Sequence, residues 1–376
     1  MVSLLRAMSS SPSLHQRNVR ALLGRALRDP TALTEMSDAD LDLTIRIARR
    51  VRLLGRLAAD LQECGAFDEL PQIAKDQMQS ALVLAESRAR LACWELDRID
   101  WVLSDSLDTD LIAMKGCTYL LLDLPNTRGR IFADVDLMLP EAELEEVEAR
   151  LNEHGWRTQE LTPYDENYYR KWTHELPPLV HVEREVEIDL HHNILPRTAR
   201  LKPDAKKLLA AAKPVAGSPF RVLCDEDIVL HAMVHLMFSD DMADKLRDMV
   251  DIDELLQTFS RQDAAFWQRL VARGEELDLR RPAYYGLRYA QKLLDCPLPE
   301  SVLNATSGWA PPQPVVWLMD RLVPRALFPP HPDYPSRLSA FCRLLLFVRS
   351  HWIRMPPWLL AYHLSIKFYR TRLRRG

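Results

Sequence analysis

Two short segments carry carboxylates in a pattern that suits metal-dependent chemistry. Asp134 and Asp136 alternate with apolar residues over 134–139, and Asp189 does the same over 186–191. This period of two is typical of strands that bury one face. If the two strands are neighbours, the three carboxylates meet above an apolar floor. Carboxylates so close raise one another's pKa unless a cation holds them, and oxygen ligands favour a hard divalent ion such as Mg²⁺.

The plainer interpretation of such a strand is a solvated face without chemistry. Two features favour the site instead. Arg130 lies just upstream of the first strand, and Asp189 occupies the matching position in the second.

Several other residues are candidates for substrate binding. Lys115 and Arg130 suit a triphosphate, because lysine supplies a point charge and arginine can bind two oxygens at once. Gly116 would let the backbone approach a phosphate closely. His191 shares the predicted face of Asp189. The alternatives are a surface charge for Lys115 or Arg130 and a plain helix start for Gly116.

A second group of polar residues follows in a helical segment. His231 and His235 are four residues apart, so they share one helix face. With Asp251, later in the chain, they could form a cluster that supports the metal ligands or binds the acceptor. His235 is a candidate substrate contact. A zinc site would need a third ligand with clean geometry, and a buried, hydrogen-bonded histidine pair is the favoured alternative.

Composition narrows the class of protein. The 376 residues are 47% hydrophobic and 27% charged, as in ordinary globular proteins. With 11 glycines there is no GxGxxG or GxxxxGK[ST] phosphate loop, and the six cysteines form no CxxC pair. No apolar run is long enough for a signal peptide or a membrane span. We therefore expect a cytoplasmic protein with reduced thiols.

The helices and strands that must position these residues can be predicted from the spacing of apolar residues and from the residues that begin and end helices. Helical patterns run from Asp38 to about Ile99 and from a predicted N-cap at Asp225 to about Leu294. Between them the sequence predicts short strands and helices, and after them a Pro-rich segment that wraps the surface. The expected elements of the middle region are a strand at 111–114, helices at 117–124 and 140–155, and an antiparallel hairpin of 179–182 with 186–190.

The order of these motifs resembles a known family. Lys115-Gly116 after a short strand, then Gly129-Arg130-x₃-Asp134-x-Asp136-Leu, and finally Ile188-Asp189-Leu-His191 are similar to the uncharacterised nucleotidyltransferase-like family of the polymerase-β superfold. The resemblance extends over roughly 40–295. One difference is that Lys115-Gly116 stands where the superfold usually has Gly-Ser, and it stands further from the aspartates.

The resemblance implies an α+β fold, with a small mixed β-sheet as the nucleotidyltransferase core and helical regions on both sides. It implies transfer of a nucleoside monophosphate from an NTP donor to an unidentified acceptor hydroxyl. Asp134, Asp136 and Asp189 would be the catalytic carboxylates and would hold two Mg²⁺ ions, with Mn²⁺ as an alternative. The predicted division is a helical region at 1–100, the core at 101–195, a linker at 196–224, a helical domain at 225–296, and a Pro-rich and basic amphipathic segment at 297–376.

The C-terminal segment carries its own signal. Nine Lys and Arg and no acidic residue lie between Arg337 and Arg375, among several aromatic residues. Over 341–375 this pattern predicts either a docked helical hairpin or peripheral contact at the inner face of an anionic membrane. The alternative function is a catalytically inactive nucleotide-binding accessory protein that this segment would hold at the periphery of the membrane. The family resemblance implies a surface-polymer or peptide-export system as the process that such a protein would serve. Nucleic acid is not favoured as a partner, because the net charge is −4.

Overall fold

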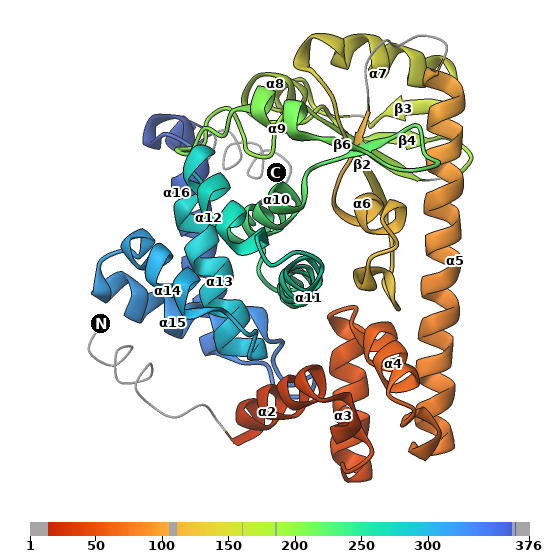
Figure 1. The fold of residues 1–376 in the computed structure, drawn as a ribbon, viewed down its shortest axis with the longest axis vertical. Coiled ribbons are helices and arrows are strands. Elements are labelled where there is room, and N and C mark those ends of the chain that lie inside the picture. Colours follow the sequence, from red (N-terminus) through yellow and green to blue (C-terminus); the bar gives the residue numbers. More distant parts are fainter. Residues whose placement is uncertain (1–13, 105–110, 160, 185, 363–364, 366–376) are drawn as a thin grey trace, which may run out of the picture.

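A seven-stranded mixed sheet lies at one end of the computed structural model, beside the upper part of helix α5 (Gln72–Leu103) in Figure 1. The structure describes residues 14–104, 111–159, 161–184, 186–362 and 365. The strand order is β3-β4-β5-β2-β1-β7-β6. Of the neighbouring pairs, β2·β5 and β1·β7 are parallel, and the others are antiparallel. The strands are β1 (Ile112–Ala113), β2 (Asp134–Met138), β3 (Trp156–Thr158), β4 (Leu179–His181), β5 (Glu187–His191), β6 (Lys213–Pro214) and β7 (Arg221–Val222).

Helices enclose the sheet from both ends of the chain. The expected α+β class, a small mixed sheet with N- and C-terminal helical regions, is thereby confirmed. The N-terminal helices are α2 (Leu14–Arg28), α3 (Asp38–Arg50), α4 (Leu54–Glu63) and α5 (Gln72–Leu103), and those between the strands are α6 (Lys115–Leu121), α7 (Leu144–Glu153), α8 (Pro163–Trp172) and α9 (Ala205–Ala211). The C-terminal helices are α10 (Asp225–Phe238), α11 (Leu246–Gln262), α12 (Phe266–Glu276), α13 (Arg280–Leu294), α14 (Glu300–Thr306), α15 (Gln313–Leu327) and α16 (Arg337–Arg354).

Helix α5 connects the N-terminal helices to the sheet. In Figure 1 it runs along one edge of the molecule, from α4 at one end to the strands at the other. Its last turns bury Ile99 and Leu103 in an apolar cluster with α7 and the inner face of the sheet, where Val135, Leu137 and Ile188 lie. The predicted apolar floor beneath the carboxylates is therefore present.

Two glycines allow the N-terminal helices to approach the sheet. Gly55 in the first turn of α4 lies against Gly129 in the loop before β2. A Cβ atom on Gly129 would lie 2.0 Å from the carbonyl carbon of Gly55, and Gly129 has a φ of +63°. Only glycine combines that backbone conformation with so close a contact. The Gly-Arg motif seen in the sequence therefore seats this loop on α4.

Some expectations need correction. The Pro-rich stretch 297–335 contains α14 and α15, because proline is accepted in the first turn of a helix. The N-cap of α10 is Cys224 rather than Asp225, which is the first helical residue. The expected linker 196–224 contributes α9 and also β6 and β7, which extend the sheet beyond β1. The division into domains stays a prediction.

Candidate active site

The two predicted strands pair as neighbours, in parallel and in register. Asp136 lies opposite Asp189, and Asp134 lies opposite Glu187 one pleat earlier. Ligand atoms of Asp136, Asp189 and His191 all lie within 4.8 Å of one another. Asp134 is exposed and lines the adjoining pocket. The structure thus brings Asp136 and Asp189 together and leaves Asp134 at the mouth of the site.

The Asp136 carboxylate has two donors on the same oxygen. Lys115 Nζ lies 2.5 Å and His191 Nε2 lies 3.1 Å from Asp136 Oδ1. The carboxylate is only 2% exposed. Burial opposes its ionisation, but Lys115 and His191 outweigh burial and hold the pKa of Asp136 well below its usual range. Asp136 is therefore an ionised carboxylate in a nearly dry environment.

Asp189 has the opposite electrostatic character. Burial, and then the negative charge of Asp136 beside it, raise the pKa of Asp189 from 3.8 to about 7. Two carboxylates at one register position cannot both be ionised at little cost without more positive charge. This pair therefore favours a bound cation, as the alternating pattern of the two strands predicts.

Lys115 reaches this position through an unusual backbone. It is the first residue of α6 and has a φ of 48°, in the left-handed region. The strand before it is held by a hydrogen bond from the Met114 amide to the Asp136 carbonyl of 2.9 Å. Gly116 follows, and a Cβ there would lie 3.0 Å from the Phe132 ring. The Lys-Gly pair thus forms a tight turn that aims the ammonium at the carboxylates.

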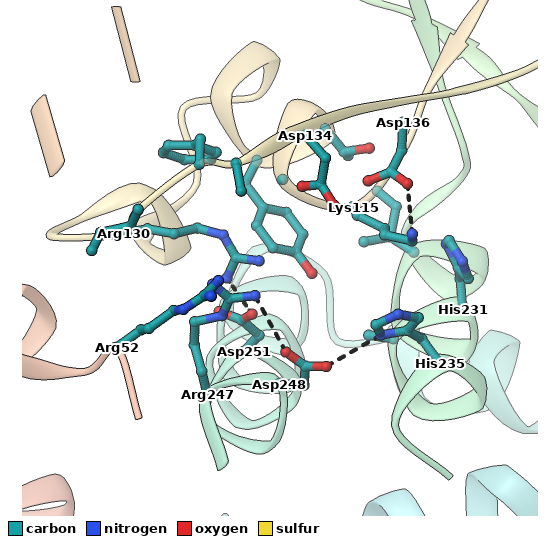
Figure 2. Close-up of a pocket in the computed structure, with 18 of the residues that line it drawn as sticks. Arg52, Lys115, Arg130, Asp134, Asp136, His231, His235, Arg247, Asp248 and Asp251 are labelled. Atoms are coloured by element: carbon teal, nitrogen blue, oxygen red, sulfur yellow. Dashed lines mark hydrogen bonds and ion pairs between the residues drawn. The ribbon is translucent and has the colours of Figure 1, made fainter. Parts of the chain in front are cut away.

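A pocket of about 230 Å³ opens beside the carboxylates. Figure 2 shows Asp134, Asp136 and Lys115 on one side of it and three arginines on another. Five cations from four parts of the chain line it: Arg52, Lys115, Arg130, Lys245 and Arg247. The N-terminal helices, the β2 edge and α11 therefore all contribute to its walls.

Arg130 is held firmly in the wall of this pocket. It forms an ion pair with Asp251, and its guanidinium lies 5.1 Å from the centre of the Tyr119 ring. The Asn126 amide donates to the Asp251 carbonyl at 3.0 Å. Burial is outweighed by Asp251, so the pKa of Arg130 is raised. Asp251 is therefore engaged with Arg130 rather than with the histidines, contrary to the sequence-based cluster.

The two helical histidines do share a face, but their partner differs from the expected one. His235 Nδ1 lies 3.2 Å from Asp248 Oδ2, and Lys245 Nζ lies at the same distance from that oxygen. The His231 and His235 ring centres are 6.5 Å apart. Burial lowers the pKa of His231 well below its usual range, so this imidazole is neutral. The arrangement is close to the favoured interpretation of a hydrogen-bonded histidine pair, with His231 buried, His235 half-buried and Asp248 as the partner in place of Asp251.

Three cations that line the pocket were not among the residues expected from the sequence: Arg52, Lys245 and Arg247. Arg52 lies in the turn between α3 and α4 with a φ of 58°. Within the described residues it is exposed and has no carboxylate partner, unlike the other pocket cations. The one signal in the sequence is that Lys245 and Arg247 lie close to Asp248 along the chain. Nothing local marks Arg52, because its place in the pocket depends on how helices far apart in sequence pack together.

Comparison with known proteins agrees with this geometry. A family model described as an uncharacterised nucleotidyltransferase matches residues 37–295, which is more than half of the chain. The chain belongs to this family. The match contains both carboxylate strands and every residue of the pocket, and nucleotidyl transfer is the general activity that membership supports. No curated protein and no solved structure matches the chain.

The described helices of this nucleotidyltransferase include none whose length and apolar character would suit a membrane span.

Proposed function

We propose that this nucleotidyltransferase moves a nucleoside monophosphate from an NTP to an acceptor hydroxyl and requires Mg²⁺. The observation that carries the proposal is the pairing of Asp136 with Asp189 at the edge of a pocket lined by cations. Carboxylates bind the metal that a nucleotide needs, and cations bind its phosphates. A site with both at adjoining walls suits an NTP.

The donor set fits a hard divalent ion. Asp136 offers a buried carboxylate and Asp189 a half-buried one, with ligand atoms within 4.8 Å of each other. Asp134 lies on the same face of β2 toward the pocket. The pKa of Asp189 is raised because the positive charge near the two strands does not balance both carboxylates. These three residues would hold Mg²⁺, which would neutralise the phosphates and polarise the reacting phosphoryl group.

The side chains of the protein have separable roles in this proposal. Asp189, the register partner of Asp136, would accept the proton of the acceptor hydroxyl. Lys115 neutralises Asp136 and is near enough to the pocket to turn toward a phosphate. His191 fixes the Asp136 carboxylate through its Nε2.

The opposite wall would hold the triphosphate. Arg52 and Arg247 line the pocket from α3–α4 and α11. Arg130 is held by its ion pair with Asp251, so in this proposal it supplies positive charge from a fixed position in the pocket wall and does not move to bind a phosphate. Gly116 and His235 complete the predicted substrate contacts, on α6 and α10. This arrangement would replace the Gly-Ser of the superfold with side chains from the flanking helices.

Labelled nucleotides test the reaction type. The protein is incubated with Mg²⁺, an extract that supplies acceptors, and each NTP labelled at the α- or the γ-phosphate. We expect label from the α-phosphate alone to appear on an acceptor, and Asp136→Asn to abolish it. Label transferred from the γ-phosphate would indicate a phosphoryl transfer instead, and would contradict the proposal.

A peripheral membrane contact is a second proposal, supported by the outer face of α16. This helix is docked on the protein: Arg200 Nε donates to the Trp352 carbonyl at 3.1 Å, and Cys342 is fully buried. Its outer face and the residues after it nevertheless expose large apolar side chains, namely Leu344, Phe347, Val348, Trp352 and Trp358. Residues 363–364 and 366–375 of the basic segment lie outside the described residues.

Vesicle flotation tests this contact. Wild type should float with anionic vesicles, and the Leu344→Ser/Val348→Ser variant should float less. If both proteins float equally, or if neither floats, the proposed membrane contact is wrong.

A further inference from the structure

A second group of ligand-type side chains lies on the other side of His191 from Asp136. His174, Glu175 and His191 place one ligand atom each within 4.8 Å of one another. Glu175 Oε2 lies 3.4 Å from His191 Nδ1 and 3.9 Å from His174 Nε2. Separations of this size suit three ligands on one tetrahedral ion, because metal–ligand bonds are close to 2.0–2.2 Å for zinc.

The backbone holds this group in place. Glu175 is bridged to His191 across an antiparallel pairing at the end of β5. The Leu176 amide donates to the Leu190 carbonyl, and the His192 amide donates to the His174 carbonyl, each at 2.9 Å. The two histidines and the glutamate therefore lie on paired backbone rather than on a loose loop, as a metal site requires.

The hydrogen bonding of His191 points to a ligand at its other nitrogen. Its Nε2 lies 3.1 Å from Asp136 Oδ1, and an ionised carboxylate only accepts, so Nε2 carries the proton. Its Nδ1 is buried without a hydrogen-bond partner, although the side chain is only 1% exposed. A neutral His191 would point the lone pair of Nδ1 at the Glu175 carboxylate. Such an arrangement is unfavourable unless a cation lies between the two.

We propose that His174, Glu175 and His191 bind one Zn²⁺ ion. Two histidines and a glutamate are a recognised ligand set for zinc, with the fourth position left to water or substrate. Glu175 and His174 retain partial exposure, with side chains 26% and 17% accessible, so the fourth position has a route to solvent. The inference is independent of the proposed reaction, since the ion differs and the test needs no nucleotide.

The ion would also act on the neighbouring carboxylate. A histidine bound to a metal through one nitrogen commonly donates its other N–H to a carboxylate, which fixes the ring orientation. Zinc on His191 Nδ1 would lock Nε2–H toward Asp136. The zinc site would therefore position the carboxylate that we assign to Mg²⁺, and link the two sites through one imidazole.

Cobalt and zinc titrations of the chelator-treated, full-length protein test the site. We expect one Co²⁺ per chain with the visible absorption of a four-coordinate site, displaced by one equivalent of Zn²⁺. His174→Gln and Glu175→Gln should each weaken Co²⁺ binding roughly 100-fold or more, since each removes a ligand. Loss of a residue that only hydrogen-bonds to a metal ligand typically costs about 10–100-fold. His154→Gln, an exposed histidine on another part of the core, is the matched control and should bind like wild type.

Two further readouts keep the outcomes distinct. Zn²⁺ should raise the Tm of wild type and of Asp134→Asn but not of Glu175→Gln; circular dichroism without metal verifies that each variant is folded. Binding well below one equivalent, or binding unchanged by Glu175→Gln, would overturn the proposal. Asp134 does not belong to the proposed zinc ligands. If Asp134→Asn loses nucleotide binding but is still stabilised by Zn²⁺, the zinc site is intact and the two proposals are tested separately.

Discussion

Asp136 and Asp189 are register partners on parallel strands, yet their carboxyl groups have pKa values shifted in opposite directions. The difference arises from their neighbours: Lys115 and His191 both approach Asp136, whereas Asp189 is half-buried beside the negative charge of Asp136. One group is thereby kept ionised, and the other is able to hold a proton near neutral pH. This asymmetry is what a pair of carboxylates needs for different roles.

The Asp189 pKa predicts how stability depends on pH in the absence of metal. Between its ordinary value of 3.8 and about 7, the folded state binds more protons at Asp189 than the unfolded state does. The stability contributed by this group is therefore full at low pH and is lost as pH rises to 7. The loss is at most about 4 kcal/mol, at about 1.36 kcal/mol for each pKa unit.

Denaturant unfolding between pH 4 and 8 measures this effect. Asp189→Asn should reduce the decline and should be more stable than wild type at pH 8, while the exposed variant Asp68→Asn should keep the wild-type profile. Added Mg²⁺ should also reduce the decline in wild type. Identical profiles for wild type and Asp189→Asn would contradict the assigned pKa.

Arg52 is predicted to bind the phosphates beyond the α-phosphate. It is an exposed cation of the pocket wall, and among the described residues it has no carboxylate partner. Arg52→Ala should weaken ATP binding roughly tenfold, which corresponds to about 1.4 kcal/mol, and should leave AMP binding nearly unchanged. Arg50→Ala, a nearby exposed arginine outside the pocket, is the control. Equal losses for ATP and AMP would argue against a role at the distal phosphates.

The contact between Gly55 and Gly129 predicts an unequal cost of two glycine substitutions. Gly129 and Gly217 both have a positive φ, but a Cβ on Gly129 would collide with Gly55, whereas Gly217 has nothing within 4 Å. Gly217→Ala should cost about 1 kcal/mol of stability, the usual penalty of the left-handed conformation. Gly129→Ala should cost clearly more and should lower nucleotide affinity by displacing Arg130. Similar Tm values for the two variants would show that the loop can move away at little cost.

Arg184 anchors the β4–β5 hairpin to α5 through a buried carboxylate. Its Nε and Nη2 each donate to Glu95 at 2.9 Å, and the Glu95 side chain is fully buried. Arg184→Met would leave that carboxylate without its partner, which typically costs about 3–5 kcal/mol. The double variant Arg184→Met/Glu95→Leu should recover much of the loss in a denaturant titration. A double variant as unstable as the single one would show that Arg184 acts mainly through its contact with Trp156.

The carboxylate strands were predictable because their information is local. Alternation over 134–139 and 186–191 fixes which side chains share a face, and a one-residue slip would bury the aspartates. The opposite wall was not predictable, because Arg52 and Arg247 meet only through the packing of helices far apart in sequence. The sequence analysis grouped Asp251 with the histidines, but Asp248 meets His235. The two aspartates are about one helical turn apart on α11, so spacing alone does not show which one faces the histidine.

Proline explains the largest error in the secondary structure. The stretch 297–335 has many prolines, and the sequence analysis predicted only that it wraps the surface, without placing a helix in it. In the structure, proline in the first turn starts α15 and a second proline, Pro324, lies inside that helix, where tertiary packing outweighs its low propensity. Composition cannot distinguish a proline that begins a helix from one that prevents it.

The most direct test of the central claim is calorimetry with ATP, GTP, CTP and UTP, each with and without Mg²⁺. Wild type is compared with the Asp134→Asn/Asp136→Asn double variant, with circular dichroism confirming that both are folded. The account predicts Mg²⁺-dependent binding of at least one NTP by wild type and loss of that binding in the variant. Binding that survives in the double variant, or a folded wild type that binds no NTP, would contradict the assignment of these aspartates to a metal–nucleotide site.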